Sequence, residues 1–173
     1  FRRVLFRSAH ESVVDEVCFT TGKDPVEFRL VYVSDQRDKD VIEAAAKKAG
    51  WQRRTAARKQ RNGDIAIGQG IAYSTRNGTR VAVIAEVEVD MKTGKVRGKK
   101  FTVAHDCGIV INPQLLTQTI EGNVSQALSR AIHEEVKFDT KNVTSVDWET
   151  YPILDFTERP LEIDVVLINR QNI

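Results

Sequence analysis

The stretch AHDCGIVINPQLLTQTIEGNVSQALSRAIHEEV, residues 104–136, contains the end of a predicted strand, a turn and the longest predicted helix of the chain. Asn112 is a favourable N-cap and Pro113 suits the first helical position, so we expect a helix over about residues 112–136. Apolar residues recur every four positions along this helix, which predicts one buried stripe. The stripe consists of Leu116, Ile120, Val124, Leu128 and Ile132.

Gly122 lies in the middle of this predicted helix. A glycine in a helix interior costs about 1 kcal/mol relative to alanine. A position that carries this cost indicates that another group approaches the helix backbone closely there.

The turn before the helix places His105, Asp106 and Cys107 in consecutive positions, and three interpretations are open. A metal site is disfavoured, because consecutive side chains of a strand alternate between its two faces and structural zinc sites use paired ligand spacings. A Cys–His nucleophile is sterically possible, since positions i and i+2 share a face, but no oxyanion-stabilising group accompanies it. Composition favours a simple strand-to-helix turn, in which Gly108 relieves the backbone.

Upstream of this stretch, the N-terminal third of the chain predicts three helices. The first, residues 10–21, places four residues on one face: Val13, Val14, Val17 and Cys18. The second begins with Asp24 as N-cap and Pro25 at the first position, and the third ends at Gly50.

The middle of the chain changes to β character. Strands are expected over residues 66–75 and 80–90, the second with apolar residues at every other position from Val81 to Val89, and Asn77-Gly78 between them is a strong signal for a two-residue hairpin. A third strand is expected over 95–106, and residues 136–148 and 162–170 also have β character. We therefore predict an α+β fold: N-terminal helices, a small antiparallel sheet with the long helix packed on it, and further strands at the C-terminus.

Residues 1–8, FRRVLFRS, have no helix cap and no polar patterning. We expect them to be an artefact of cloning or read assembly, with a genuine basic amphipathic segment as the alternative. The domain itself is then residues 9–173. Without the three arginines of this segment the formal net charge changes from +2 to −1, so the charge does not indicate an anionic partner.

Residues 52–64 are polar and carry five cations before any acidic residue: Arg53, Arg54, Arg58, Lys59 and Arg61. A nucleic-acid site would interleave such cations with aromatic side chains, and only Trp51 is near. A solvated connector and no nucleic-acid partner are therefore expected. The longest apolar runs have the length of a strand and are too short to span a membrane.

The order of residues in the opening stretch resembles the molybdopterin-binding large subunit of the xanthine dehydrogenase and aldehyde oxidase family, in particular its isoquinoline 1-oxidoreductase beta-subunit type. The resemblance lies in an Asp-x-Gly turn, an Asn-Pro helix start and typical residues at several helix positions. These are Asp106–Gly108, Asn112–Pro113, Gln118, Glu121–Gly122 and Gln126. Residues 13–30, 70–90 and 143–160 also look typical of this type, so the resemblance covers about residues 9–173.

The resemblance implies a protein that binds a molybdenum–pterin cofactor, molybdopterin, in its dinucleotide form. Such enzymes hydroxylate a carbon next to nitrogen in a heteroaromatic ring, or oxidise an aldehyde, with oxygen from water. Electrons then leave through iron–sulfur clusters on a small partner subunit. The compartment stays open between cytoplasm and periplasm.

By the same resemblance, Gln126 is expected near the cofactor, because its amide both donates and accepts hydrogen bonds. Gly122, four positions earlier on the same helix face, leaves room for the cofactor. Many relatives have glycine where this chain has Ala127. The family's catalytic glutamate lies in a Gly-x-Gly-Glu segment that follows the strand matching residues 163–170, and that segment is not in this sequence.

We therefore assign no catalytic residue and no metal ligand, and expect this piece of the large subunit to be inactive alone. The alternative is a non-catalytic α+β binding or assembly module, in which the cations of residues 52–61 contact an acidic partner.

Overall fold

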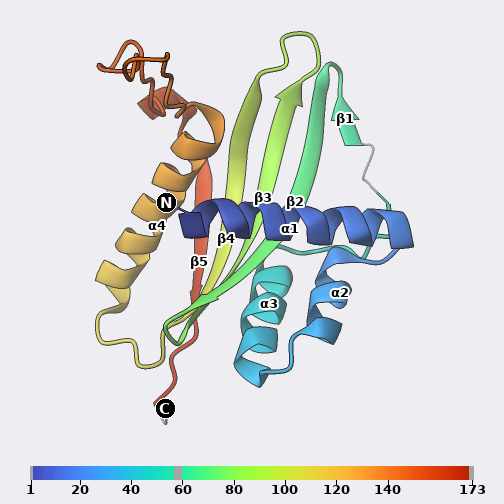
Figure 1. Ribbon diagram of the computed structural model, residues 1–173. Coiled ribbons are helices and arrows are strands. Elements are labelled where there is room, and N and C mark those ends of the chain that lie inside the picture. The colour runs from blue at the N-terminus through green and yellow to red at the C-terminus, as the bar shows by residue number, and fades with distance from the viewer. Residues whose placement is uncertain (1, 57–59, 172–173) are drawn as a thin grey trace.

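The computed structural model describes residues 2–56 and 60–171 and confirms the α+β class. Along the chain, three helices precede a five-stranded sheet with the order β1-β2-β3-β4-β5 (Figure 1). A fourth helix follows β4 in the sequence and belongs to the connection that leads to β5. The helices are α1 (Arg2–Thr21), α2 (Pro25–Tyr32), α3 (Gln36–Lys48) and α4 (Pro113–Ile132), with a 3-10 helix at Phe156–Glu158. The strands are β1 (Gln60–Asn62), β2 (Ile65–Arg76), β3 (Thr79–Asp90), β4 (Val96–Asp106) and β5 (Glu162–Leu167).

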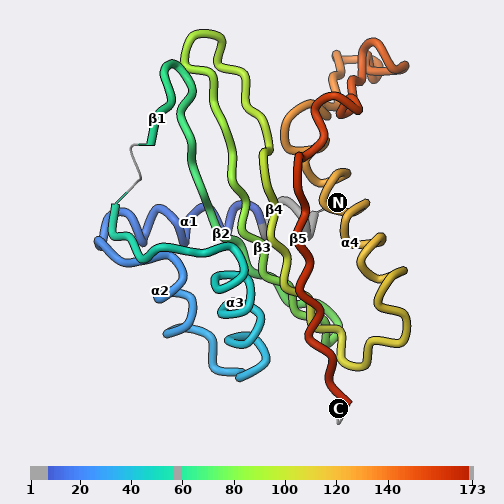
Figure 2. Tube along the Cα trace, turned by 180° about the vertical axis from the view of Figure 1, so that it is seen from behind, coloured from blue at the N-terminus to red at the C-terminus, as the bar shows by residue number. Residues whose placement is uncertain are grey.

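The expected antiparallel meander and a further C-terminal strand are both present, and that further strand makes the sheet mixed. Strands β1 to β4 form an antiparallel meander, whereas β5 pairs parallel to β4, with Val103 opposite Val165. Parallel neighbours require a long crossover connection, and α4 with the segment after it supplies one. In both views α4 runs beside β5 (Figures 1 and 2), and it contacts β4 and β5.

The predicted turns and caps are confirmed. Asn77 and Gly78 both have positive φ, 49° and 80°, as a type I′ hairpin turn requires. The Asp24 carboxylate accepts hydrogen bonds from the backbone N–H groups at the start of α2, at 2.9 and 3.0 Å. It is buried and also accepts from Trp51 Nε1, so this cap ties α2 to the segment that follows α3.

The main hydrophobic core lies between α2, α3 and one face of the sheet. Its buried members are Val26, Val41, Ile42, Ala45, Ile71, Ala82, Ile84 and Ala104. Val103 is buried but faces the other way, because neighbouring residues of a strand alternate.

Helix α4 packs on this second face of the sheet. A Cβ built on Gly98 of β4 would lie only 2.9 Å from the Leu128 side chain, so glycine permits the close approach. The predicted stripe of α4 is confirmed: Ile120 and Leu128 are buried, and its other members are half-buried.

Helix α1 buries only part of the face that its valines indicated, with Val14 half-buried. Val13 and Val17 are 56% and 37% exposed, while Cys18 is buried. The helix turns Glu11 toward the sheet, where its carboxylate accepts from Tyr73 N at 3.0 Å and from Arg29 at 2.8 Å. An ion pair therefore sets the orientation of α1. The helix includes most of residues 1–8, and their origin as an artefact stays a prediction.

Helix α4 ends at Ile132 and not at residue 136, with His133 as its C-cap. The β character expected over 136–148 is reduced to one bridge between Phe138 and Val143. Large apolar side chains are exposed along the irregular segment after α4: Val136, Phe138, Val143, Val146, Trp148, Ile153, Phe156 and Leu161.

The basic connector is more ordered than expected. It contains β1, and Arg54 stacks on the Trp51 ring at 3.9 Å and donates to the Gln69 carbonyl. Arg53 pairs with Glu27 at 2.7 Å. Of the five cations, Arg58 and Lys59 lie outside the described residues. No described helix combines the length and the apolar character that crossing a membrane requires.

Candidate functional site

Asp106, in the turn that leads into α4, is completely buried and ion-paired. Arg37 of α3 donates to both carboxylate oxygens, at 3.0 and 2.5 Å, and Arg170 donates to one of them at 2.6 Å. The backbone N–H of Gly108 donates to the same carboxylate at 3.0 Å. Arg170 also pairs with Asp40, so this buried cluster joins α3, the end of β4 and the segment after β5.

Burial alone would raise the pKa of Asp106, but the hydrogen bonds from Arg37, Arg170 and Gly108 outweigh it and hold that pKa well below its usual range. The carboxylate is therefore ionised and serves as an anchor. The interpretation of this stretch as a strand-to-helix turn is confirmed, because Gly108 has φ 87° and the Asn112 side chain accepts from Leu115 N at 3.0 Å.

The two neighbours of Asp106 are placed differently. His105 is half-buried, and its burial lowers its pKa against the opposing charge of Asp106. Cys107 follows the end of β4 and is exposed. Across residues 2–56 and 60–171, no three His, Cys, Asp or Glu side chains gather closely enough to hold a metal ion.

The residues expected to bind the cofactor lie on the outer side of α4. Gly122 lines an open groove of about 370 Å³ between α4 and residues 159–163. Gln126 is exposed one turn further along α4 and does not line the groove. The groove is lined by Gln118, Glu121, Gly122, Ser125, Arg159, Pro160, Leu161 and Ile163.

Gly122 gives the groove a stretch of bare backbone. A Cβ built at this position would meet no atom within 4 Å, so no other described part of the chain makes the close approach that the glycine indicated. The space is available to a ligand. Sequence reasoning missed two polar groups of the groove, Ser125 and Arg159. Ser125 has the right helical spacing from Gly122 to be found, whereas Arg159 is remote in sequence and gave no signal.

These groups suit a polar, anionic organic molecule such as a pterin cofactor with a phosphate. The Gln118 amide can pair with the mixed donors and acceptors of a pterin edge, and Gln126 lies one turn beyond the groove. The Arg159 guanidinium suits a phosphate, and the space at Gly122 admits a flat group. The residues present therefore fit the expected cofactor.

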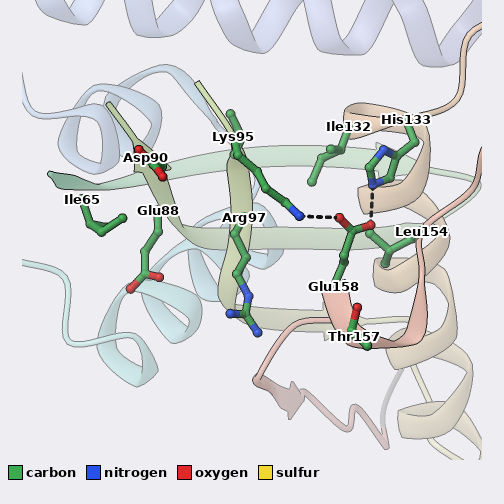
Figure 3. Close-up of a pocket in the computed structure, with 11 residues that line it drawn as sticks. Ile65, Glu88, Asp90, Lys95, Arg97, Ile132, His133, Leu154, Thr157 and Glu158 are labelled. Carbon is green, nitrogen blue, oxygen red and sulfur yellow. Dashed lines mark hydrogen bonds and ion pairs between the residues drawn. The ribbon is translucent and has the colours of Figure 1, made fainter. Parts of the chain in front are cut away.

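A second hollow, of about 300 Å³, lies between β3, β4, the end of α4 and residues 154–158 (Figure 3). Lys95 Nζ and His133 Nε2 both approach the Glu158 carboxylate, at 3.0 and 2.7 Å. The hydrogen bond from Lys95 is the main cause that lowers the pKa of Glu158. Glu88, also on this hollow, pairs with Lys99 at 3.0 Å. Because the pairs of Glu158 with Lys95 and His133 join the β3–β4 turn to the segment after α4, this hollow braces that segment and is the weaker candidate for a ligand site.

A family model described as a molybdopterin cofactor-binding domain matches residues 76–160, which include β3, β4 and α4. One of the subunits of nicotinate dehydrogenase from Pseudomonas putida is 40% identical over 95% of this chain, and the beta chain of isoquinoline 1-oxidoreductase from Brevundimonas diminuta is 29% identical over 92%. The chain spans 14% and 20% of the length of these two relatives.

Among solved structures, quinoline 2-oxidoreductase from Pseudomonas putida 86 matches 54% of this chain and 12% of its own chain, with a TM-score of 0.51 and 26% identity. The similarity in sequence and the similarity in fold therefore lead to the same group of proteins.

Proposed function

The chain belongs to the xanthine dehydrogenase and aldehyde oxidase family, as part of a molybdopterin-binding subunit, and from this premise we propose that the outer side of α4 holds part of the molybdenum cofactor. One observation carries the proposal. Gly122 presents bare backbone beside an open groove, with Gln126 one turn away on the same helix, inside the range that the family model matches.

In this proposal, the residues of this chain bind the cofactor and fix its orientation. The Gln126 amide donates to and accepts from polar atoms of the bound group, which fixes its rotation. The absent side chain at Gly122 allows that group to approach the helix backbone. When bound, the cofactor supplies the redox chemistry. The Asp106 cluster holds the turn that sets the start of α4, and so keeps this surface in place.

For the full-length enzyme we propose hydroxylation of a nitrogen heteroaromatic compound with oxygen from water. Three of the similar proteins support this class over aldehydes, because nicotinate dehydrogenase, isoquinoline 1-oxidoreductase and quinoline 2-oxidoreductase are all named after such rings. The dinucleotide form of the cofactor and a small iron–sulfur subunit that accepts the electrons are part of the same proposal. These 173 residues alone should not turn over substrate, because the family's catalytic glutamate segment is not among them.

The test uses a full-length subunit that contains this sequence. Gly122→Leu fills the space beside the groove, and Asn123→Leu, at the next exposed position of α4, is the control. Leucine favours helix more than glycine does, so a loss cannot come from a weakened helix. We expect Gly122→Leu to abolish most bound molybdenum and pterin, measured by metal analysis and pterin fluorescence, and Asn123→Leu to retain them. Full cofactor content in Gly122→Leu would contradict the proposal.

The alternative of a binding module for an acidic partner receives less support. Arg53 pairs with Glu27, and Arg54 stacks on Trp51, so two of the five cations are engaged within the chain. No observation on the described residues favours this module over the cofactor groove.

A further inference from the structure

Arg159 stands on the wall of the groove opposite α4, and we infer that it binds a phosphate group of the ligand that occupies the groove. This inference rests on the proposed function, since it names the chemistry of one end of that ligand. The Arg159 side chain is exposed, and its guanidinium lies over the Phe156 ring with 4.9 Å to the ring centroid. Within the described residues it makes no ion pair, in contrast to Arg29, Arg37, Arg80 and Arg170.

The surroundings of Arg159 suit a phosphate. Its planar guanidinium offers two parallel donors that match phosphate oxygens. Across the groove, the Gln118 amide and the bare backbone at Gly122 add polar groups and space. The Ser125 hydroxyl donates to the Glu121 carbonyl at 3.0 Å, which leaves its oxygen to accept from a ligand hydroxyl.

The wall that carries Arg159 is held on both sides. The preceding residue, Glu158, accepts from Lys95 of the β3–β4 turn and from His133 at the end of α4 (Figure 3). Two residues later, Leu161 N donates to the Lys99 carbonyl at 3.0 Å. Because these contacts hold the backbone on either side, binding of an anion requires ordering of the Arg159 side chain but not of the segment that carries it.

Glu121 lines the same groove and opposes an anion. The half-buried Glu121 makes no ion pair in the described part of the chain, so the charge of its carboxylate lowers the affinity of the groove for phosphate. The opposite charges of Arg159 and Glu121 predict opposite effects on phosphate binding. Removal of the Arg159 charge should weaken phosphate binding, and removal of the Glu121 charge should strengthen it.

The ligand class is a phosphate ester, and two sources share this chemistry: a monophosphate, and the diphosphate of a dinucleotide. The experiment titrates the ¹⁵N-labelled 173-residue chain with inorganic phosphate and with pyrophosphate, followed by amide shifts. We expect shifts confined to residues 118–125 and 159–163. Tighter binding of pyrophosphate assigns the diphosphate source, and equal binding assigns the monophosphate.

Three variants complete the test. Arg159→Gln should weaken binding about tenfold, which is the value of one charge-assisted contact. Glu121→Gln should strengthen it, and Arg130→Gln, an exposed arginine of α4 outside the groove, should leave it within about twofold. Unchanged shifts at remote amides show that each variant is folded.

The inference is overturned if neither anion shifts the groove, if the shifts lie elsewhere, or if Arg159→Gln and Arg130→Gln behave alike. Because no cofactor is present, the result is independent of the Gly122→Leu test. A failed titration together with cofactor loss in Gly122→Leu removes the role of Arg159 and leaves the proposed function standing. Phosphate binding with full cofactor retention assigns the groove to another phosphate ester.

Discussion

The Asp106 cluster and the α4 groove are both rich in polar and charged side chains, yet they use them in opposite ways. In the cluster, the completely buried Asp106 carboxylate accepts from Arg37, Arg170 and a backbone N–H. In the groove, neither Arg159 nor the half-buried Glu121 makes an ion pair among the described residues, and Arg159 contacts only the Phe156 ring. Charges that satisfy one another hold a fold together, whereas charges left open beside a hollow are available to a ligand.

The largest expected effect follows from breaking the cluster. Asp106→Asn removes the negative charge and replaces one carboxylate oxygen with an NH2 group that cannot accept from an arginine, so Arg37 and Arg170 lose part of their partner. We expect the free energy of unfolding to fall by about 3–5 kcal/mol, as for other broken buried ion pairs. Urea denaturation followed by circular dichroism measures it. Asp139→Asn, an exposed carboxylate that accepts only from loop backbone, is the control and should change stability by about 0.5 kcal/mol or less. An equal effect of both changes would contradict the contrast.

Low pH should remove part of the free energy of unfolding that the Asp106 cluster contributes. The pKa of Asp106 is lowered in the folded state, so the chain gains stability above the unfolded pKa of about 4 and loses it as pH falls further. Stability measured from pH 6 down to pH 3 should therefore decline, and less steeply in Asp106→Asn. Asp24 and Asp40 have lowered pKa values too, so some slope should persist. Identical slopes for the two chains would show that Asp106 is not a major source.

A smaller loss is expected at the Asp24 cap. Asp24→Ala removes the acceptor for the first N–H groups of α2 and for Trp51 Nε1. The free energy of unfolding should fall by about 1–2 kcal/mol. Glu27→Ala, in the same first turn but exposed, should change it by about 0.5 kcal/mol or less. Trp51 fluorescence during denaturation reports on both, and similar values would mean that burial of the cap adds nothing.

In the groove, a substitution is expected to raise the free energy of unfolding instead of lowering it. Gly122→Ala places a methyl group where no atom lies within 4 Å, at a helical position, so it should stabilise the chain by about 0.5–1 kcal/mol. Thermal denaturation of the two chains checks this. A destabilised variant would mean that Gly122 serves the packing of this domain, and the groove would lose its main distinction from the cluster.

The smallest effect is expected at Arg159. Because its guanidinium is exposed and has no carboxylate partner in the described chain, Arg159→Gln should alter the free energy of unfolding by about 0.5 kcal/mol or less. The same urea experiment applies. A larger loss would place Arg159 among the residues that hold the fold and would remove the reason to assign it to a ligand.

Local signals in the sequence predicted the local parts of this fold. The Asp24 and Asn112 caps and the Asn77-Gly78 hairpin are where they were expected, because each depends on residues a few positions apart. The parallel pairing of β5 was missed, and so was the pairing of Asp106 with Arg37 and Arg170. Those partners lie more than sixty residues away, at distances that no local pattern encodes.

The candidate site shows the same division. Gly122 and Gln126 are on one helix, and their spacing together with the family resemblance named them. Arg159 lies on the opposite wall, which only the path of the chain after α4 brings near. The orientation of α1 was not predicted either. The ion pair between Glu11 and Arg29 determines it, although it leaves Val13 and Val17 exposed.

The missing side chain at Gly98 has a consequence for the whole surface that α4 presents. It forms a notch in β4 into which Leu128 seats, 2.9 Å from where a methyl group would stand. A side chain at this position would force the ends of the Leu128 and Phe101 side chains to shift, and would change how α4 packs on the sheet. The absence of a side chain at Gly98 therefore helps to determine how closely α4, and the surface on its outer side, lies against the sheet.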